Sequence, residues 1–273
     1  MTPTADLRDA YLTLLARSLC GMLYQDESLG VFTEDGGEEQ DFFATDVRLA
    51  FKEGGSFDEA ARKEGRDWPR SAHTMIGEKR LANIRFCVER VLEDGVPGDL
   101  IETGVYRGGA CIFMKGVLKA HDVTDRRVWL ADSFRGFDPN PERYPLDQEF
   151  VELPAKVSRF PHAKATPASV SETFERYGLL DDNVNFLVGW FKDTLPDAPI
   201  KELAVVRLDG DMYSSTFEAL THLYPRLSVG GYLIVDDYVL SGCRTAVNDF
   251  RKAHGINDEI ERIDWTGIYW RKS

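Results

Sequence analysis

Four aspartates follow two short apolar segments of the chain. Asp209 and Asp211 come directly after the run LAVVRL. Asp236 and Asp237 come directly after GGYLIV. Both runs have the continuous hydrophobicity of buried parallel strands, whose carboxyl ends share the edge of the sheet where ligands bind. Four carboxylates crowded at that edge would repel one another, and a bound divalent cation would relieve the repulsion. Oxygen-only ligands favour Mg²⁺, or alternatively Mn²⁺.

A second interpretation of these aspartates needs no ligand. Each of them could cap the helix that follows it, because Asp is a favoured N-cap residue. Alternatively, the acids could pair with Arg207 or Arg244, which lie next to the two runs. The metal interpretation and the capping interpretation make different predictions about how many carboxylates lie without a cationic partner.

The first buried run, DLI, ends in Glu102, Thr103 and Gly104, and the chain enters a helix after Arg107. Glycines at such a turn let a ligand approach the backbone and leave the helix N-terminus free to face it. Three residues separate Gly104 from Gly108, so the spacing is not that of a dinucleotide-binding fingerprint. An ordinary tight turn is the alternative.

Two further strand ends carry candidate ligand-binding residues. Asp132 and Ser133 follow the run RVWLA, where an acid can accept both hydroxyl groups of a ribose, or can simply cap a helix. Gly189, Trp190 and Phe191 follow the run NVNFLV. One of these aromatic side chains could cover a flat base, although both are equally plausible in a hydrophobic core.

The elements that must position these residues read as an open, doubly wound α/β sheet. Strands near residues 100–102, 128–131, 184–188, 205–208 and 232–235 alternate with helices of ten or more residues, which implies right-handed crossovers. Two last short runs, 259–263 and 267–271, predict a closing antiparallel hairpin. The long polar connection at residues 135–166 is expected to be a lid over the binding site, with a solvated surface excursion as the alternative.

The residues before the sheet predict a helical extension. Apolar side chains at helical spacing indicate one amphipathic helix at residues 7–22 and another at residues 81–91, which stops near Gly95. Residues 34–40 predict an exposed loop, and the charged stretch 42–70 has no clear periodicity. We therefore predict a helical extension and cap at residues 1–95 and a catalytic domain at residues 96–273.

Composition limits the classes of function. The 273 residues are 43% hydrophobic, and 33 basic against 46 acidic residues give a net charge of −13, which argues against a nucleic-acid binder. No apolar run approaches the roughly 18 residues of a membrane span, and the N-terminus does not resemble a secretion signal. Four scattered cysteines and five isolated histidines favour neither disulfides nor zinc. His73 and His162 are either near the site or ordinary packing residues. We expect a soluble cytoplasmic enzyme.

Several motifs in order resemble the macrocin O-methyltransferase family: HTMIG, ETGVYRGGACIF, ADSFRGF, YGLLDDNV, GWFKDTLP, RLDGDMY and GGYLIVDDY. The resemblance extends from about Pro69 to Arg271. It implies a seven-stranded class I methyltransferase sheet of the Rossmann-like type. It also implies an enzyme that uses S-adenosylmethionine and Mg²⁺ to methylate deoxysugar hydroxyls of glycosylated natural products in antibiotic biosynthesis.

The resemblance also assigns roles to individual residues. It makes Asp209, Asp236 and Asp237 the metal ligands and Asp211 the general base. The residues in or beside the motifs that would bind the methyl donor are Thr74, Met75, Glu102, Thr103, Gly104, Arg107, Asp132, Ser133, Gly189, Trp190, Phe191 and Asp209. The stretch 26–57 is longer and more acidic than the family pattern, which leaves the sugar and the aglycone open. The N-terminal helices could pair subunits in a homo-oligomer.

Three other functions compete with methyl transfer. The sequence Asp209-Gly210-Asp211 has the form of the DxD motif of a metal-dependent glycosyltransferase acting on a natural product. A dinucleotide oxidoreductase would need a different glycine spacing and an acid about 20 residues after the glycines. A non-catalytic small-molecule binding module would not need buried acids arranged for a metal.

Overall fold

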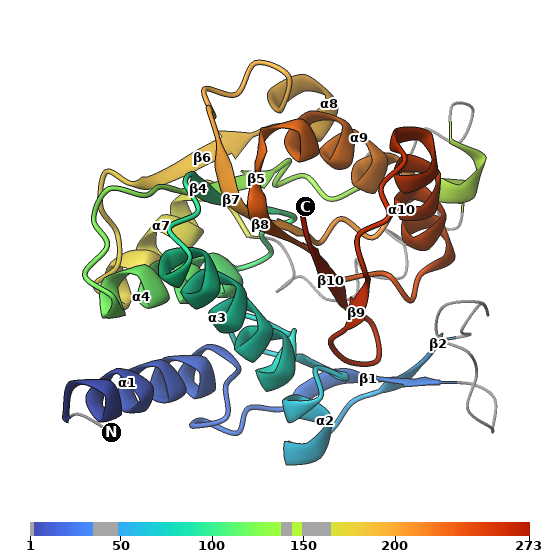
Figure 1. Cartoon of the computed structure of the whole chain (residues 1–273). Helices are drawn as coiled ribbons and strands as arrows, with labels where there is room; N and C mark the ends of the chain where they lie inside the picture. Colours follow the sequence, from blue (N-terminus) through green and yellow to red (C-terminus); the bar gives the residue numbers. More distant parts are fainter. Residues whose placement is uncertain (1–2, 35–48, 138–143, 149–164) are drawn as a thin grey trace.

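The structure is a computed structural model of the whole chain, and it describes residues 3–34, 49–137, 144–148 and 165–273. Its centre is a seven-stranded sheet with helices on both faces (Figure 1). The strand order is β6-β5-β4-β7-β8-β10-β9. The strands are β4 (Asp99–Thr103), β5 (Val128–Asp132), β6 (Val184–Val188), β7 (Leu203–Leu208), β8 (Leu227–Val235), β9 (Glu261–Arg262) and β10 (Ile268–Arg271). The predicted doubly wound, seven-stranded sheet is thereby confirmed.

The first five strands are parallel, and β10 returns antiparallel to β8 and pairs with β9 as the predicted hairpin. Successive side chains of a strand point to opposite faces, so these strands can be apolar throughout only if both faces are covered. Ile101 and Val206 belong to one buried core, whereas their neighbours Leu100 and Val205 belong to the other.

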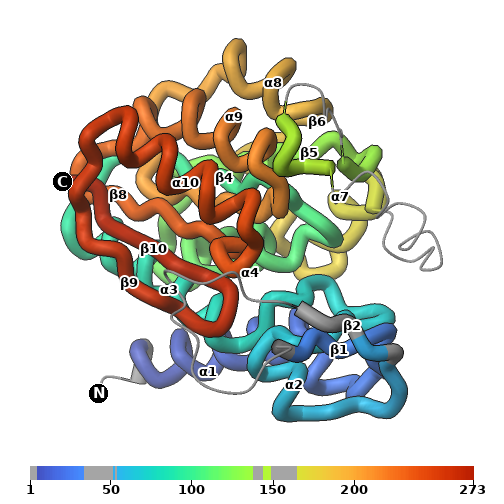
Figure 2. Tube along the Cα trace, turned by 90° about the vertical axis from the view of Figure 1, so that its right-hand side faces the viewer, coloured from blue at the N-terminus to red at the C-terminus, as the bar shows by residue number. Residues whose placement is uncertain are grey.

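One face of the sheet is covered by α3 (Gly77–Glu93), α4 (Gly109–Ala120) and α7 (Pro167–Arg176). The opposite face is covered by α8 (Phe191–Thr194), α9 (Tyr213–Leu223) and α10 (Ser241–His254), which lie together in Figure 2. Two short 3-10 turns, η1 (Pro145–Asp147) and η3 (Tyr224–Arg226), lie next to α9. The helix α3 contacts β7 and β8, although the predicted boundary assigns it to the N-terminal part.

The N-terminal part contains strands that the sequence analysis did not predict. The helix α1 (Pro3–Leu19) packs on α4, and α2 (Glu59–Lys63) precedes α3. The residues between α1 and α3 also form a three-stranded antiparallel sheet of order β2-β1-β3. Its strands are β1 (Ser28–Glu34), β2 (Leu49–Glu53) and β3 (Asp67–Pro69). These strands are short and pair across many residues, so no local periodicity marks them.

The predicted amphipathic helix at residues 7–22 is buried in its second half. Leu12, Leu15 and Leu19 are buried against α3 and α4, whereas Leu7 is 72% exposed and Tyr11 37% exposed. The first residues of the predicted apolar face therefore lie at the surface.

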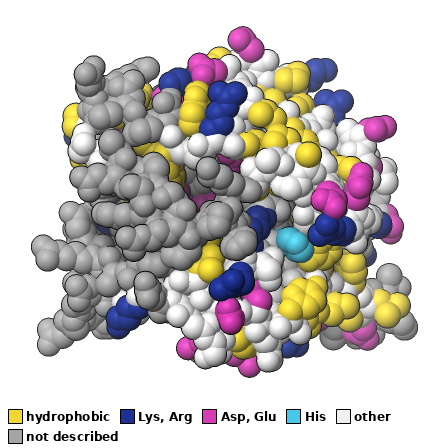
Figure 3. Space-filling view, turned by 180° about the vertical axis from the view of Figure 1, so that it is seen from behind, with side chains coloured by type: hydrophobic (Ala, Val, Ile, Leu, Met, Phe, Trp, Pro, Cys, Tyr) yellow, Lys and Arg dark blue, Asp and Glu magenta, His cyan; other side chains and the backbone are white. Residues whose placement is uncertain are grey.

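On the molecular surface seen in Figure 3, basic and acidic side chains lie interspersed among hydrophobic ones, with no extended patch of either sign among the residues drawn in colour. Among the described helices, none is long and apolar enough to span a bilayer.

Candidate active site at the carboxyl edge of the main sheet

The direction of chain connection reverses between β4 and β7, which are neighbours in the sheet although β5 and β6 separate them in sequence. Such a switch point is where ligands bind in open α/β sheets. The main-chain bonds of the sheet continue past the strand ends here. Asp209 donates its amide to Thr103 at 2.8 Å, and Asp236 donates its amide to Leu208 at 2.8 Å. The loops that carry the acids are therefore fixed to the sheet.

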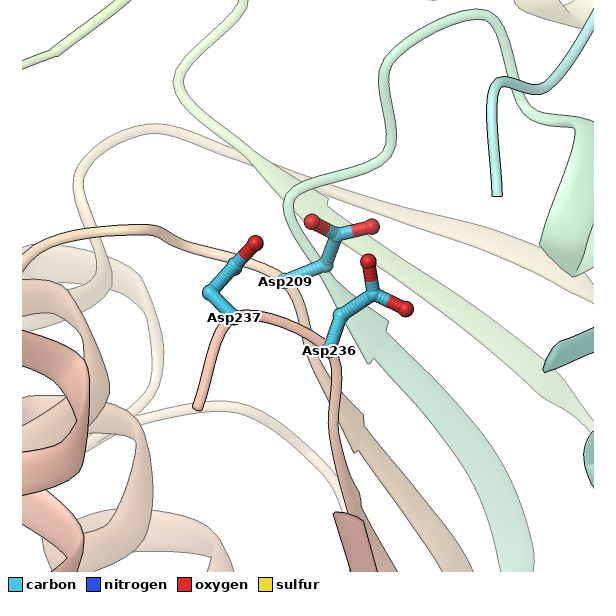
Figure 4. Close-up of side chains that lie close together, drawn as sticks. All are labelled: Asp209, Asp236 and Asp237. Atoms are coloured by element: carbon cyan, nitrogen blue, oxygen red, sulfur yellow. The ribbon is translucent and has the colours of Figure 1, made fainter. Parts of the chain in front are cut away.

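Three of the predicted acids converge at this edge. Asp209, Asp236 and Asp237 each offer a carboxylate oxygen, and these oxygens all lie within 4.8 Å of one another. Figure 4 shows the three side chains arising from the neighbouring ends of β7 and β8, with their carboxylates at the same end of the strands. Three oxygen atoms at this spacing fit a hard divalent cation such as Mg²⁺.

Two buried arginines, one on β7 and one on α3, bind the same acids. Arg207 of β7 is fully buried and its guanidinium donates to Glu102, to Asp209 at 2.6 Å and to Asp236. Arg80 of α3 donates to the other oxygen of Asp236. The side chain of Arg207 reaches Asp209 because residues two apart in a strand point to the same face.

Arg80 also forms an ion pair at 3.0 Å with Asp264 from the turn between β9 and β10. Within the described part of this edge, two guanidinium groups thus face six carboxyl groups: Glu102, Asp209, Asp211, Asp236, Asp237 and Asp264. The alternative in which arginine pairing neutralises the aspartates is present here but incomplete.

The excess of acid shows in the pKa values. Burial, with the charge of Asp236 added to it, raises the pKa of Asp209 to about 6. Burial and the neighbouring carboxylates raise the pKa of Asp237 well above its ordinary value, the charge of Asp211 being the largest contribution from a neighbour. Each of these shifts would be reversed by a cation placed among the oxygens.

Asp211 has an uncommon backbone conformation. Its φ is +61°, in the left-handed region that side chains other than Gly rarely adopt, and its amide donates to Oδ2 of Asp237 at 3.0 Å. Burial and the charges of Asp209 and Asp236 raise the pKa of Asp211 to about 7. A carboxyl group with that pKa can accept a proton near neutral pH.

The turn after β4 is packed tightly against the acid loop. Gly104 has a φ of +85°, and a Cβ on it would lie 1.6 Å from the carbonyl oxygen of Asp209. No other residue fits there without moving one of the two loops. Gly108, with a φ of +86°, precedes the first residue of α4. The predicted turn therefore exists, and it brings the N-terminus of α4 to the switch point.

Glu102 and Thr103 end β4 and are both buried. One carboxylate oxygen of Glu102 accepts from Arg207 and the other lies 2.7 Å from Sγ of Cys111, which donates to it. Burial raises the pKa of Glu102 to about 7 against the opposing charge of Arg207. Glu102 therefore joins the donor-side turn to the acid cluster through one guanidinium.

Asp132 fixes two loops with its carboxylate. Oδ2 accepts from the amide of Val105 at 2.7 Å, and Oδ1 accepts from the amide of Phe134 at 2.7 Å. Its position at the end of β5 agrees with the prediction, and the amides of Tyr106 and Ser133 also donate to its carboxylate. Ser133 accepts from the amide of Arg135 at 3.0 Å, which shapes the beginning of the long connection.

The HTMIG segment lies against the N-terminus of α4. The amide of Gly109 donates to the carbonyl of His73 at 3.0 Å, and a Cβ on Gly109 would lie 2.6 Å from Cβ of Thr74. Arg107 donates to the carbonyl of Ala72 at 2.9 Å and so holds the same segment. Thr74 is buried and Met75 is partly exposed. These predicted residues border the first glycine turn.

The aromatic residues after β6 differ in packing. Gly189, with a φ of +150°, donates its amide to the carbonyl of Asp132 at 2.9 Å, so this turn lies next to the one after β5. Phe191 packs on the second core, and a Cβ on Gly210 would lie 3.4 Å from its ring. Trp190 is the half-buried N-cap residue of α8.

Sequence reasoning missed several residues of this edge. It gave no role to Arg80, Asp264 or Cys111, whose partners in the structure lie on other elements. Arg80 carried one weak signal, a basic residue adjoining the apolar face of a predicted helix. Of the two histidines considered, His73 binds Tyr177 through Nδ1 at 3.0 Å, and His162 lies outside the described residues.

Comparison with known proteins decides the family. Residues 8–272 match the family described as Macrocin-O-methyltransferase (TylF). The chain belongs to the macrocin O-methyltransferase family. The chain is 48% identical over 284 residues to mycinamicin III 3''-O-methyltransferase of Micromonospora griseorubida, covering 100% of both proteins. It is 50% identical over 269 residues to 8-demethyl-8-(2,3-dimethoxy-alpha-L-rhamnosyl)-tetracenomycin-C 4'-O-methyltransferase of Streptomyces olivaceus, covering 98% of this chain and 94% of that one.

The solved structure of the O-methyltransferase NovP superimposes with a TM-score of 0.82 at 46% identity, covering 97% of this chain and 99% of that chain. This member of the macrocin O-methyltransferase family is therefore an O-methyltransferase, and its named relatives modify natural products. The family assignment decides against the glycosyltransferase, oxidoreductase and binding-module alternatives.

Proposed function

We propose that this protein transfers a methyl group from S-adenosylmethionine to a deoxysugar hydroxyl of a glycosylated natural product, with Mg²⁺ at the acid cluster. The convergence of Asp209, Asp236 and Asp237 at the switch point carries the proposal. The name of one relative supports a sugar acceptor, since it is a 4'-O-methyltransferase of a rhamnosyl compound.

The residues that would hold the cation are Asp209, Asp236 and Asp237, because their oxygens are the hard ligands that Mg²⁺ prefers. A divalent cation there would lower the pKa of a hydroxyl group that contacts it. Arg207 and Arg80 keep Asp236 in place with a bond to each of its oxygens.

Asp211 would act as the general base. As the acceptor oxygen forms its bond to the methyl carbon, the bond from that carbon to the donor sulfur breaks and S-adenosylhomocysteine leaves. The hydroxyl proton passes to a carboxylate oxygen of Asp211. Burial, the largest cause of the raised pKa of Asp211, favours its protonated form and so suits this uptake of a proton.

The donor would lie along the turns after β4, β5 and β6, which are joined by main-chain bonds. Gly104 donates its amide to Ala131 at 2.9 Å, and the next turn is tied by the bond from Gly189 to Asp132. Thr74, Met75 and Arg107 border the first turn, and Trp190 borders the third. Asp132, at the end of β5, would lie beside the ribose of the donor.

A direct test incubates the protein with methyl-labelled S-adenosylmethionine, Mg²⁺ and a panel of glycosylated antibiotics. We expect one acceptor sugar to gain the labelled methyl group, as read by mass spectrometry of the products. Omitting the donor and replacing the panel by the corresponding aglycones are the controls. Labelled product from aglycones alone would contradict the proposed sugar acceptor.

We also propose that the protein forms a homo-oligomer through its N-terminal part. The helix α1 leaves Leu7 72% exposed and Leu14 58% exposed, on the face opposite the buried residues. Size-exclusion chromatography with light scattering of the wild type and of Leu7→Glu/Leu14→Glu tests this. A wild type that elutes as a monomer would contradict it.

A further inference from the structure

A carboxylate far away in sequence caps the helix that follows the proposed base. Asp147 is fully buried in η1, which belongs to the connection between β5 and α7. Its Oδ1 accepts from the amide of Tyr213 at 2.7 Å, and its Oδ2 accepts from the amide of Ser214 at 3.1 Å. These two amides are the first of α9, so both oxygens of Asp147 are bonded to the beginning of one helix.

The helix needs this partner. The first amides of a helix have no acceptor within it, and a carboxylate at that end also interacts favourably with the helix dipole. The local N-cap residue of α9 is Met212, whose side chain makes no capping bond. Ser214 is 7% exposed, so water cannot readily replace the missing acceptor. Asp147 therefore supplies what the adjacent sequence lacks.

The position of α9 connects this cap to the chemistry. The helix begins two residues after Asp211, and the loop between β7 and α9 is held at each of its ends. At the strand end, Asp209 donates to the carbonyl of Thr103, and in the middle, the amide of Asp211 donates to Asp237. At the helix end, the loop is fixed by the two bonds to Asp147.

The neighbourhood of Asp147 is closely packed. The rings of Tyr144 and Tyr213 lie 5.8 Å apart. A Cβ on Gly242, in the first turn of α10, would lie 3.2 Å from the amide nitrogen of Tyr213. The helices α9 and α10 follow the two strands that present the acid cluster, and η1 contacts both helices. Movement of Asp147 would therefore displace the loops after β7 and β8, which carry Asp211 and Asp237.

We infer that Asp147 is a positioning residue for methyl transfer. By capping α9 it holds Asp211 in its left-handed conformation, with the carboxylate directed toward the acid cluster. This inference rests on the proposed function, in which Asp211 accepts the acceptor proton. It also makes η1 part of the catalytic apparatus, although no atom of Asp147 touches the reacting groups.

The test compares turnover, donor affinity and amide exchange in the full-length protein. We expect Asp147→Ala to lower kcat by roughly 10- to 100-fold, because small displacements of a catalytic group reduce rate by such factors. The Kd for S-adenosylhomocysteine should stay within about twofold, since both hydrogen bonds of Asp147 go to α9 and not to the turns proposed to hold the donor. Hydrogen exchange of the Tyr213 and Ser214 amides should accelerate. Asp147→Asn, which keeps an acceptor oxygen, should give an intermediate kcat.

A matched control is the cap of another helix. Asp58 caps α2 by accepting from the amide of Ala61 at 3.1 Å. Asp58→Ala removes a cap from the N-terminal part, and its kcat should equal that of the wild type. Thermal unfolding of each variant shows that it is folded at the assay temperature. If Asp147→Ala fails to fold, Asp147→Asn takes its place in the comparison.

Three results would overturn the inference. Wild-type kcat in both folded Asp147 variants would remove Asp147 from any positioning role. Equal losses of kcat and donor affinity would show general unfolding of the site instead. A wild-type protein that transfers no methyl group to any acceptor would remove the proposed function and this inference together, which the first two results would not do.

Discussion

Buried arginines bind clusters of acids in two regions of this molecule, and the two clusters differ in how many of their acids have a cationic partner. In the N-terminal part, Arg62 binds Asp26 and Asp67, each at 2.7 Å, and the carbonyl of Cys20 at 3.0 Å. Asp26 also accepts from the amide of Ser71 at 2.6 Å. The guanidinium of Arg62 therefore has protein acceptors around it, and each of the two acids has a cationic partner.

At the carboxyl edge of the main sheet, Arg207 binds three carboxylates and Arg80 binds one of them again, whereas neither arginine is hydrogen-bonded to Asp211 or Asp237. Around Arg62, bonds from Arg62 and Ser71 outweigh burial and lower the pKa of Asp26, although burial raises the pKa of Asp67. At the sheet edge, burial and neighbouring acids raise the pKa values of Asp209 and Asp211 to about 6 and about 7. Around Arg62, both acids have a cationic partner within the protein. At the sheet edge, neither arginine binds Asp211 or Asp237, so a bound cation can balance their charge.

The largest expected effect concerns the base. Asp211→Asn keeps the size of the side chain and removes its ability to accept the proton, so kcat should fall by about 10²- to 10⁴-fold. The Kd for S-adenosylhomocysteine, measured by calorimetry, should remain that of the wild type. Near-normal turnover would remove Asp211 from the role of base and leave the cluster without an assigned proton acceptor.

The cluster of Arg62, Asp26 and Asp67 should contribute to stability and not to Mg²⁺ binding. Arg62→Met leaves Asp26 and Asp67 buried without a cation, so the free energy of unfolding should fall by about 3–5 kcal/mol. Urea denaturation measures this loss. The Mg²⁺ affinity of the folded variant should not change. A shift in Mg²⁺ affinity would show that the two networks are coupled and that the contrast between them is wrong.

In the acid cluster at the sheet edge, removal of one carboxylate ligand should weaken Mg²⁺ binding. Asp236→Asn should shift the Mg²⁺ dependence of activity to concentrations at least about tenfold higher, since even the groups that support metal ligands have effects of 10- to 100-fold. The matched control is Asp67→Asn, another buried acid that is bonded to an arginine. Identical Mg²⁺ titration curves for Asp236→Asn and the wild type would contradict ligation by Asp236.

The smallest expected effect is on thermal stability. Asp211 and Glu102 have pKa values of about 7 in the folded protein, against about 4 in an unfolded chain. The metal-free protein should therefore lose stability as the pH rises from about 4 to 7. A divalent cation favours the ionised carboxylates, so the rise in Tm on adding Mg²⁺ should be larger at pH 8 than at pH 6. An equal rise at both values would contradict the excess of protonated acid.

The sequence predicted the main sheet well because its strands are buried on both faces. Runs such as LAVVRL have no polar alternation, and the residues that follow them therefore lie at one edge. That reasoning brought Asp209, Asp236 and Asp237 together correctly. The motif resemblance predicted the family, which the comparisons confirmed.

What the sequence could not predict depends on contacts between distant residues. Asp147 bonds to amides 66 and 67 positions away, and Arg80 bonds to an acid 156 positions away. Nothing in the neighbouring residues marks Asp147, and the only sign of Arg80 is its place beside the apolar face of a predicted helix. The strands β1, β2 and β3 were missed for the same reason. Each is short and is stabilised by pairing with a strand that is distant in the sequence.

The cation proposed at Asp209, Asp236 and Asp237 is central to the proposed function. The measurement that tests it most directly is transfer of a labelled methyl group from S-adenosylmethionine to a glycosylated acceptor, first in Mg²⁺, then after EDTA, then after Mg²⁺ is restored. We predict product in the first and third conditions and its loss in the second. Equal product formation in all three would contradict the account, because the acids at this edge would then act without a metal.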